Sequence, residues 1–202
     1  MALNDHGYGA ILLDMPGHGE SGGRADWGVS SQIAAERAID LALHDDAVRH
    51  IAIFGYSMGS CIAVQVAVRE RRVNALVLLG AFTNLGDQIR YQFHARVPLL
   101  GEFSLLAARV IGVQVSAMRT LDLLKASASR PVLIIAGTAD SLIPVSMPLA
   151  LFQVAHEPKE LWLVQRANHT NVRDTAGPAI FDERVSMFLD KALFGSDADS
   201  SH

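Results

Sequence analysis

The chain has 202 residues, of which half are apolar and 19% are charged, a composition typical of a compact domain with a buried core. This composition excludes intrinsic disorder as the overall description. The 17 Lys and Arg residues against 21 Asp and Glu residues give a formal net charge of −4, so no nucleic-acid partner is predicted.

Short apolar runs along the chain indicate buried strands. The runs alternate with longer segments of helical spacing, a pattern typical of a parallel sheet with helices on both faces. We therefore predict an α/β fold with a parallel sheet of about five strands. The expected strands are residues 10–13, 51–54, 75–79, 132–136 and 161–164.

Helical spacing of apolar residues predicts helices over 31–43, 62–68, 145–154 and 180–193, with Pro144 in the first turn of the third. The segment at about 87–129 is helically spaced but much longer than an ordinary crossover between strands. We interpret it as a helical lid within a single domain spanning residues 1–194. The small and polar residues 195–202 are expected to form a disordered tail.

The apolar runs are too short for a membrane span, which needs about 18 to 20 residues. The first residues carry no secretory signal pattern, and the single cysteine, Cys61, excludes an internal disulfide and a cysteine-rich metal site. These features predict a cytoplasmic protein.

The run Gly55-Tyr56-Ser57-Met58-Gly59 fits the pattern G-x-S-x-G, and it lies between a predicted strand and a predicted helix. Glycines on either side permit a strained turn that exposes the serine hydroxyl. At the start of the following helix, the N–H of Met58 is free to donate to an oxyanion. Ser57 is therefore the candidate nucleophile.

A serine nucleophile needs a base, and the base needs an orienting carboxylate. Asp140 follows the predicted strand 132–136, and His169 follows the strand 161–164. Because the carboxyl ends of parallel strands share one edge of a sheet, we expect Ser57, Asp140 and His169 to converge there.

With the order Ser, Asp, His, the chain resembles the α/β-hydrolase fold serine hydrolases, in the branch of esterases and aminopeptidases. Residues 7–21 resemble the fourth strand of that family and its D-x-x-G-x-G-x-S loop, which implies that Asp14 and His18 shape a loop. Asp87 is the rival for the acid, because some relatives place the acid after the sixth strand. Cys61, one helical turn after Ser57, is interpreted as a buried small apolar residue.

The resemblance also implies three strands ahead of residues 10–13 and a loop that supplies the second oxyanion donor, neither of which is visible in the sequence. We expect a chain lacking the N-terminal strands of the family. Without the neighbouring strand, residues 10–13 either pair with 51–54 or leave open sheet edges, through which a homo-oligomer would form.

The sequence thus predicts a serine hydrolase of an ester, thioester or amide. In this mechanism Ser57 attacks, His169 moves the proton, Asp140 orients the imidazole, and Met58 N–H binds the oxyanion. The predicted partner is a small-molecule acyl substrate, with no cofactor and no metal. The alternative is a catalytically impaired fragment or a non-catalytic binding module of the same fold.

Overall fold

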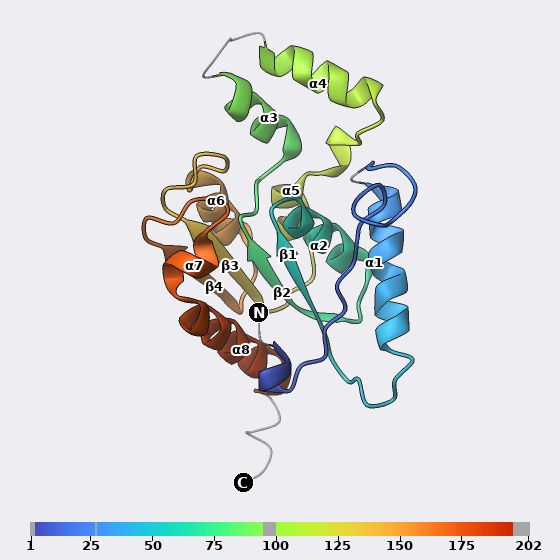
Figure 1. Cartoon of the computed structure of the whole chain (residues 1–202), viewed down its shortest axis with the longest axis vertical. Helices are drawn as coiled ribbons and strands as arrows, with labels where there is room; N and C mark the ends of the chain where they lie inside the picture. The colour runs from blue at the N-terminus through green and yellow to red at the C-terminus, as the bar shows by residue number, and fades with distance from the viewer. Residues whose placement is uncertain (1–2, 27, 95–99, 196–202) are drawn as a thin grey trace.

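A computed structural model describes residues 3–26, 28–94 and 100–195 of the chain. Within these ranges four strands form one sheet in the order β1-β2-β3-β4, and every neighbouring pair is parallel (Figure 1). The strands are β1 (Ile51–Tyr56), β2 (Val73–Leu79), β3 (Val132–Gly137) and β4 (Lys159–Val164). These four strands contain the last four apolar runs predicted from the sequence.

Alternate residues of the central strands contribute to two separate cores, as the two-residue period of a strand requires. In β2, Leu76 and Leu78 belong to one core, while Ala75 and Val77 belong to the other. All four side chains are buried. Apolar burial on both faces is the reason that these strands read as continuous apolar runs.

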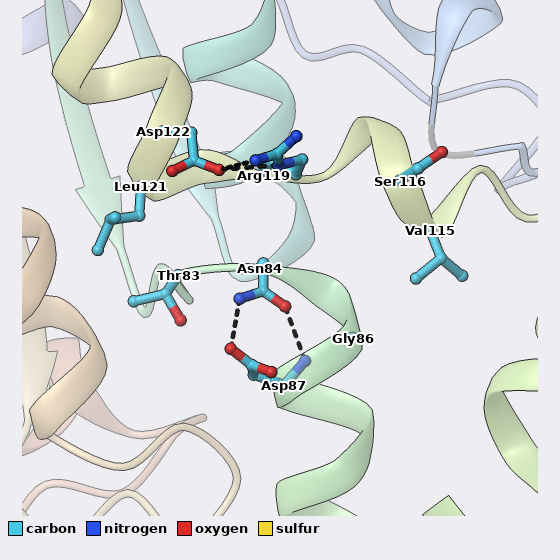
Figure 2. Close-up of a pocket in the computed structure, with 9 residues that line it drawn as sticks. All are labelled: Thr83, Asn84, Gly86, Asp87, Val115, Ser116, Arg119, Leu121 and Asp122. Carbon is cyan, nitrogen blue, oxygen red and sulfur yellow. Dashed lines mark hydrogen bonds and ion pairs between the residues drawn. The ribbon is translucent and has the colours of Figure 1, made fainter. Parts of the chain in front are cut away.

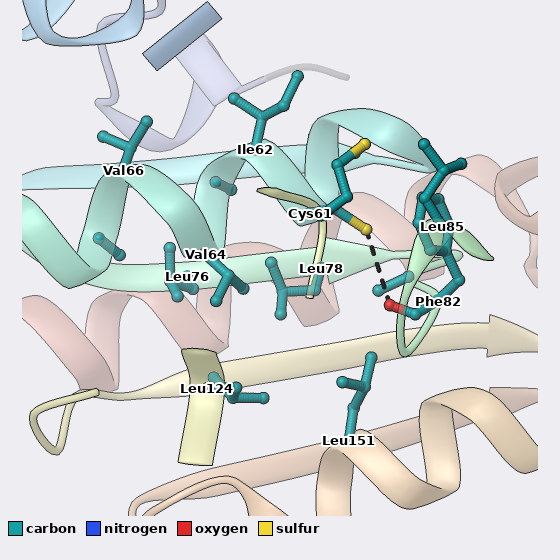
Figure 3. Close-up of a cluster of buried hydrophobic side chains, with 14 of the residues drawn as sticks. Cys61, Ile62, Val64, Val66, Leu76, Leu78, Phe82, Leu85, Leu124 and Leu151 are labelled. Atoms are coloured by element: carbon teal, nitrogen blue, oxygen red, sulfur yellow. Dashed lines mark hydrogen bonds between the residues drawn. The ribbon is translucent and has the colours of Figure 1, made fainter. Parts of the chain in front are cut away.

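The core on the first face of the sheet includes residues of the helices α1 (Val29–Ala42), α2 (Met58–Arg69), α5 (Thr120–Ala126) and α6 (Ser146–Val154). Figure 3 shows part of this core, where Val64 of α2 and Leu151 of α6 accompany Leu78. Cys61 lies here without solvent exposure, and its thiol donates to the carbonyl of Phe82 at 3.7 Å. Burial raises the pKa of this thiol to about 12, so Cys61 is the buried small residue expected.

The second face is covered by α7 (Val172–Ala176) and α8 (Pro178–Phe194). Phe181, Val185, Phe188 and Leu189 form the buried stripe of α8, in agreement with the helical spacing of the sequence. The 3-10 helix η1 (Leu3–His6) also lies against α8 (Figure 1). The sheet is therefore enclosed between two helical layers.

The segment interpreted as a lid contains α3 (Leu85–His94), α4 (Leu100–Val110), the 3-10 helix η2 (Val115–Ala117) and α5. Helices α3 and α4 lie beyond one end of the sheet (Figure 1), and Arg90 donates to Glu102 across them at 2.7 Å. That this segment acts as a lid, and that residues 1–194 form a single domain, both stay predictions. Of the expected tail 195–202, residues 196–202 lie outside the described residues.

In the described part of the chain, no single helix is both long and apolar enough to cross a membrane. One pair of helices, Leu100–Val110 with Val115–Ala126, has sufficient combined length and apolar character, but it is bent by 102°.

The predicted strand at residues 10–13 is wrong, and the sheet has four strands instead of about five. A strand exists through hydrogen bonds to a neighbour, and the order of the sheet places no described strand beside these residues. They run without regular structure, and Leu12 is 96% exposed. The third predicted helix also begins later than expected, at Ser146, so that Pro144 precedes it.

Candidate active site

Ser57 occupies the turn between β1 and α2, with a φ of 53°, a conformation that side-chain-bearing residues rarely adopt. The turn is tight because a Cβ on Gly55 would lie 2.5 Å from the carbonyl oxygen of Gly59 and 2.5 Å from the Cα of Ser60. A glycine is therefore required at position 55. The strained turn predicted around Ser57 is present.

Hydrogen bonds from the turn to the neighbouring strand hold Ser57 in this conformation. The Ser57 N–H donates to the carbonyl of Leu79 at 2.8 Å. The buried Ser60 hydroxyl lies 2.7 Å from the carbonyl of Gly55 and 3.0 Å from that of Leu79. Since Ser57 N–H is engaged, the first free donor of the turn is the N–H of Met58, the first residue of α2.

Gly59 differs from Gly55, although the motif treats the two positions alike. A Cβ added to Gly59 would meet no heavy atom within 4 Å. Close packing of the turn therefore requires a glycine at position 55 but not at position 59.

Asp140 lies in the loop after β3, and its side chain is only 2% exposed. One carboxylate oxygen accepts the N–H groups of Leu142 and Ile143, each at 2.8 Å, and the other oxygen accepts from His169. Burial opposes ionisation, but the hydrogen bonds from His169, Ile143 and Leu142 outweigh it, so the pKa of Asp140 lies below its ordinary value. Asp140 is a fixed negative charge at neutral pH.

His169 lies in the loop after β4 and connects the other two side chains. Its Nδ1 is 2.7 Å from the carboxylate of Asp140, and its Nε2 is 3.0 Å from the hydroxyl oxygen of Ser57. Because an ionised carboxylate only accepts, Nδ1 carries the proton and Nε2 is free to accept from Ser57. The structure brings together the three residues that the sequence predicted to converge.

Tyr56 is a further residue of this site that the sequence analysis did not single out. Its ring is stacked on the imidazole of His169, with centroids 5.2 Å apart and planes inclined by 29°. Its hydroxyl donates to the main-chain carbonyl of His169 at 2.9 Å. The signal in the sequence was its place immediately before Ser57, at the carboxyl end of a strand.

The rival acid, Asp87, is engaged elsewhere. Its carboxylate accepts from the side chain of Asn84 and lies 3.4 Å from a guanidinium nitrogen of Arg90. Asp140, and not Asp87, is the carboxylate that contacts His169. The geometry thus favours Asp140 as the orienting acid.

Asp14 and His18 make contacts within their own loop. The carboxylate of Asp14 accepts the N–H of Glu20 at 3.0 Å, and its carbonyl accepts from the hydroxyl of Ser21 at 2.8 Å. His18 Nδ1 lies 3.2 Å from the carbonyl of Pro16. These contacts agree with a role in shaping the loop.

A cavity of about 530 Å³ lies at the base of the helical segment (Figure 2). It is lined from the start of α3, from η2 and from the start of α5, and none of Ser57, Asp140 and His169 is among the lining residues. Gln88 of α3 connects this region to the acid loop, because its amide nitrogen donates to the carbonyl of Leu142 at 2.6 Å. The lining residues are Thr83, Asn84, Gly86, Asp87, Val115, Ser116, Arg119, Leu121 and Asp122.

The fold and this site define the chain as an α/β-hydrolase, and comparison with known proteins gives its family. Residues 1–113 match the family model described as serine aminopeptidase, S33, and the chain belongs to this family. The matched part includes Ser57 but neither Asp140 nor His169.

Two curated relatives are uncharacterised proteins. Rv2307c of Mycobacterium tuberculosis is 29% identical over 198 residues, which cover 96% of this chain and 65% of the relative. YqkD of Bacillus subtilis is 25% identical over 198 residues, covering 92% of this chain and 63% of the relative. The chain therefore spans slightly less than two thirds of the length of these relatives.

Solved structures with the same fold include two proteins whose names refer to esterases. The esterase Pf2001 of Pyrococcus furiosus superposes with a TM-score of 0.74 at 21% identity, covering 95% of this chain and 74% of that protein. A lipase-esterase related protein from Clostridium acetobutylicum superposes with a TM-score of 0.64 at 20% identity, covering 90% of this chain and 84% of that protein. At these identities the likeness establishes the fold.

Proposed function

We propose that this chain is a serine hydrolase that cleaves an ester, thioester or amide bond of a small acyl substrate. The observation that carries the proposal is the hydrogen-bonded series from Ser57 through His169 to Asp140, with Ser57 on a strained turn. The family contains serine aminopeptidases, and the fold is shared with esterases, which supports this range of substrates.

In the proposed reaction the hydroxyl oxygen of Ser57 attacks the substrate carbonyl carbon while His169 Nε2 takes the hydroxyl proton. The resulting oxyanion accepts the N–H of Met58. His169 then gives the proton to the leaving group, and an acyl group remains on Ser57. A water molecule, deprotonated by His169, releases the acid and restores the serine.

Asp140 supports both proton transfers without changing its own charge. It fixes the imidazole with Nδ1–H toward the carboxylate, and it stabilises the imidazolium that forms when His169 holds the serine proton. The two backbone donors on its other oxygen keep the carboxylate oriented.

The proposal is tested by mass-spectrometric labelling of the purified chain with a fluorophosphonate, with folding checked by circular dichroism. We expect one adduct, on Ser57, and hydrolysis of a short p-nitrophenyl ester that Ser57→Ala abolishes. A folded chain that is neither labelled nor active on esters or amides would contradict the proposal.

Matched substitutions separate the two candidate acids. We expect Asp140→Asn to lower kcat by roughly 10⁴-fold, because the amide no longer fixes and stabilises the protonated imidazole. Asp87→Asn, which removes a carboxylate bonded to Asn84 and Arg90, should retain turnover. The opposite pattern would assign the role to Asp87.

The alternative is a non-catalytic binding module with the same pocket. The point in its favour is that Met58 N–H is the one oxyanion donor assigned among the described residues. Loss of one donor typically lowers turnover by about 10² to 10³. A folded but unlabelled chain would favour this alternative.

The cytoplasmic location predicted from the sequence also stays a proposal, to be tested by fractionation of the natural host.

A further inference from the structure

The imidazole of His169 has contacts that the proposed mechanism does not use. On one side the ring of Tyr56 is stacked against it. Gly80 is also close, since a Cβ on this residue would lie 3.1 Å from His169 Cε1 and 3.9 Å from Cε2 of Tyr56. Gly80 therefore lies beside both rings, and the imidazole contacts the aromatic ring on one face and the main chain that follows β2 at its edge.

We propose that Tyr56 is a positioning residue for His169, holding the imidazole through its ring and the main chain through its hydroxyl. This inference rests on the proposed function and assigns a role within it. The two contacts act on different atoms of one residue, the ring at 5.2 Å between centroids and the carbonyl oxygen at 2.9 Å.

The loop that carries His169 is bonded to the loop after β3, where Arg166 N–H donates to the hydroxyl of Thr138 at 2.8 Å. The side-chain hydrogen bonds within the His169 turn itself are local. Asn171 accepts the N–H of Asn168, and the Asn168 side chain accepts the N–H groups of Thr170 and Asn171. These bonds fix the shape of the turn. The Tyr56 hydroxyl connects that turn to β1, the strand that ends at Ser57.

Tyr56 is well suited to this task because it shares the rigid element that presents Ser57. It is the last residue of β1, and its main chain is in register with Leu79 of β2. Any displacement of the His169 loop relative to Ser57 therefore strains the contacts with Tyr56. Burial, together with the negative charge of Asp140, raises the pKa of Tyr56, so the hydroxyl remains a donor across the neutral range.

The stacked ring also has an effect specific to the reaction. His169 becomes positively charged when it takes the proton of Ser57, and the face of an aromatic ring attracts a nearby cation. The same ring limits rotation of the imidazole away from the line between Ser57 and Asp140. Both effects stabilise the transition state more than the bound substrate, so we expect them to influence kcat and not KM.

Two substitutions separate the hydroxyl from the ring. Tyr56→Phe keeps the stack and removes one hydrogen bond, and we expect kcat to fall about three- to tenfold with KM unchanged. Tyr56→Leu removes both contacts, and the expected fall in kcat is about ten- to 100-fold. The rate of fluorophosphonate reaction with Ser57 should fall in the same order.

Tyr8→Phe is the matched control, because Tyr8 also donates its hydroxyl to an acceptor, the carboxylate of Asp190 on α8. We expect this variant to keep the kcat of the unsubstituted chain. Equal kcat in the unsubstituted chain and in both Tyr56 variants would overturn the inference. A change confined to KM would also overturn it. The same holds if kcat in the Tyr56 variants falls only as far as a lowered melting temperature reduces the amount of folded protein.

Crystal structures of the unsubstituted chain and of Tyr56→Leu test the same point without relying on activity. We expect His169 Nε2 to remain within hydrogen-bond distance of Ser57 in the first and to leave that position in the second. An imidazole unmoved in Tyr56→Leu would overturn the positioning role even in an active enzyme. A displaced imidazole in a chain that fluorophosphonate never labels would support the positioning role while contradicting the proposed hydrolase.

Discussion

Asp140 combines burial with three hydrogen bonds, and this combination makes a prediction about stability and pH. The pKa of Asp140 is lowered from its ordinary value of 3.8 in the folded chain. Between the two values the unfolded chain binds more protons, so the free energy of unfolding rises with pH there. The stabilising contribution is complete above the ordinary value and is lost as the pH falls through the lower, folded-state value.

We therefore expect Asp140→Asn to have a flatter acid limb in its stability profile than the unsubstituted chain. The measurement is urea denaturation followed by circular dichroism from about pH 7 to about pH 2. Profiles that stay parallel down to the lowest pH would show that Asp140 has the same pKa in both states.

The residues of the site were predictable to different extents. Ser57 is marked by a local pattern, and Asp140 and His169 by their places after strands of the same sheet. Tyr56 carries no such mark, because its role depends on how its ring lies against the imidazole of His169. Residue type and order along the chain do not specify that angle and distance.

The site depends on the junction of β1 with α2, and the two glycines of this junction differ in how closely they are packed. We expect Gly55→Ala to lower the free energy of unfolding by about 1 to 3 kcal/mol, because its Cβ would meet main-chain atoms of Gly59 and Ser60. Gly59→Ala faces open space on a helix and should raise it by up to about 1 kcal/mol.

Urea denaturation of both variants checks this pair, and each variant is the control for the other. If both substitutions lower the free energy of unfolding by similar amounts, the turn is not packed as the structure has it. The two results also show whether close packing requires glycine at position 55 while the fold tolerates a side chain at position 59.

The strands β1 to β4 were predictable because burial on both faces leaves a local signal, a continuous apolar run. Residues 10–13 carry the same signal and are not a strand, since hydrogen bonding to a neighbour is not encoded in the run itself. The first residues of β4, Lys159 and Glu160, were not predicted as strand, because their polar side chains do not belong to the apolar run.

At the scale of the whole molecule, β1 is the first strand in the order of the sheet, and no described strand pairs with its outer side. Phe54 and Tyr56 of β1 are 38% and 42% exposed. Ile11 and Leu12, in the segment expected to be a strand, are 48% and 96% exposed. Exposed apolar side chains and an unpaired strand edge both favour association with another chain.

The homo-oligomer predicted from the sequence can be tested through Leu12. We expect the purified chain to associate more as its concentration rises, and Leu12→Lys to shift it toward the monomer, because a charged side chain opposes burial in an interface. Leu41→Lys is the matched control, since Leu41 is 65% exposed but lies on α1. Sedimentation velocity over a concentration series gives the measurement. A chain that stays monomeric, or an equal effect of the two substitutions, would exclude the segment around Leu12 as a contact between copies.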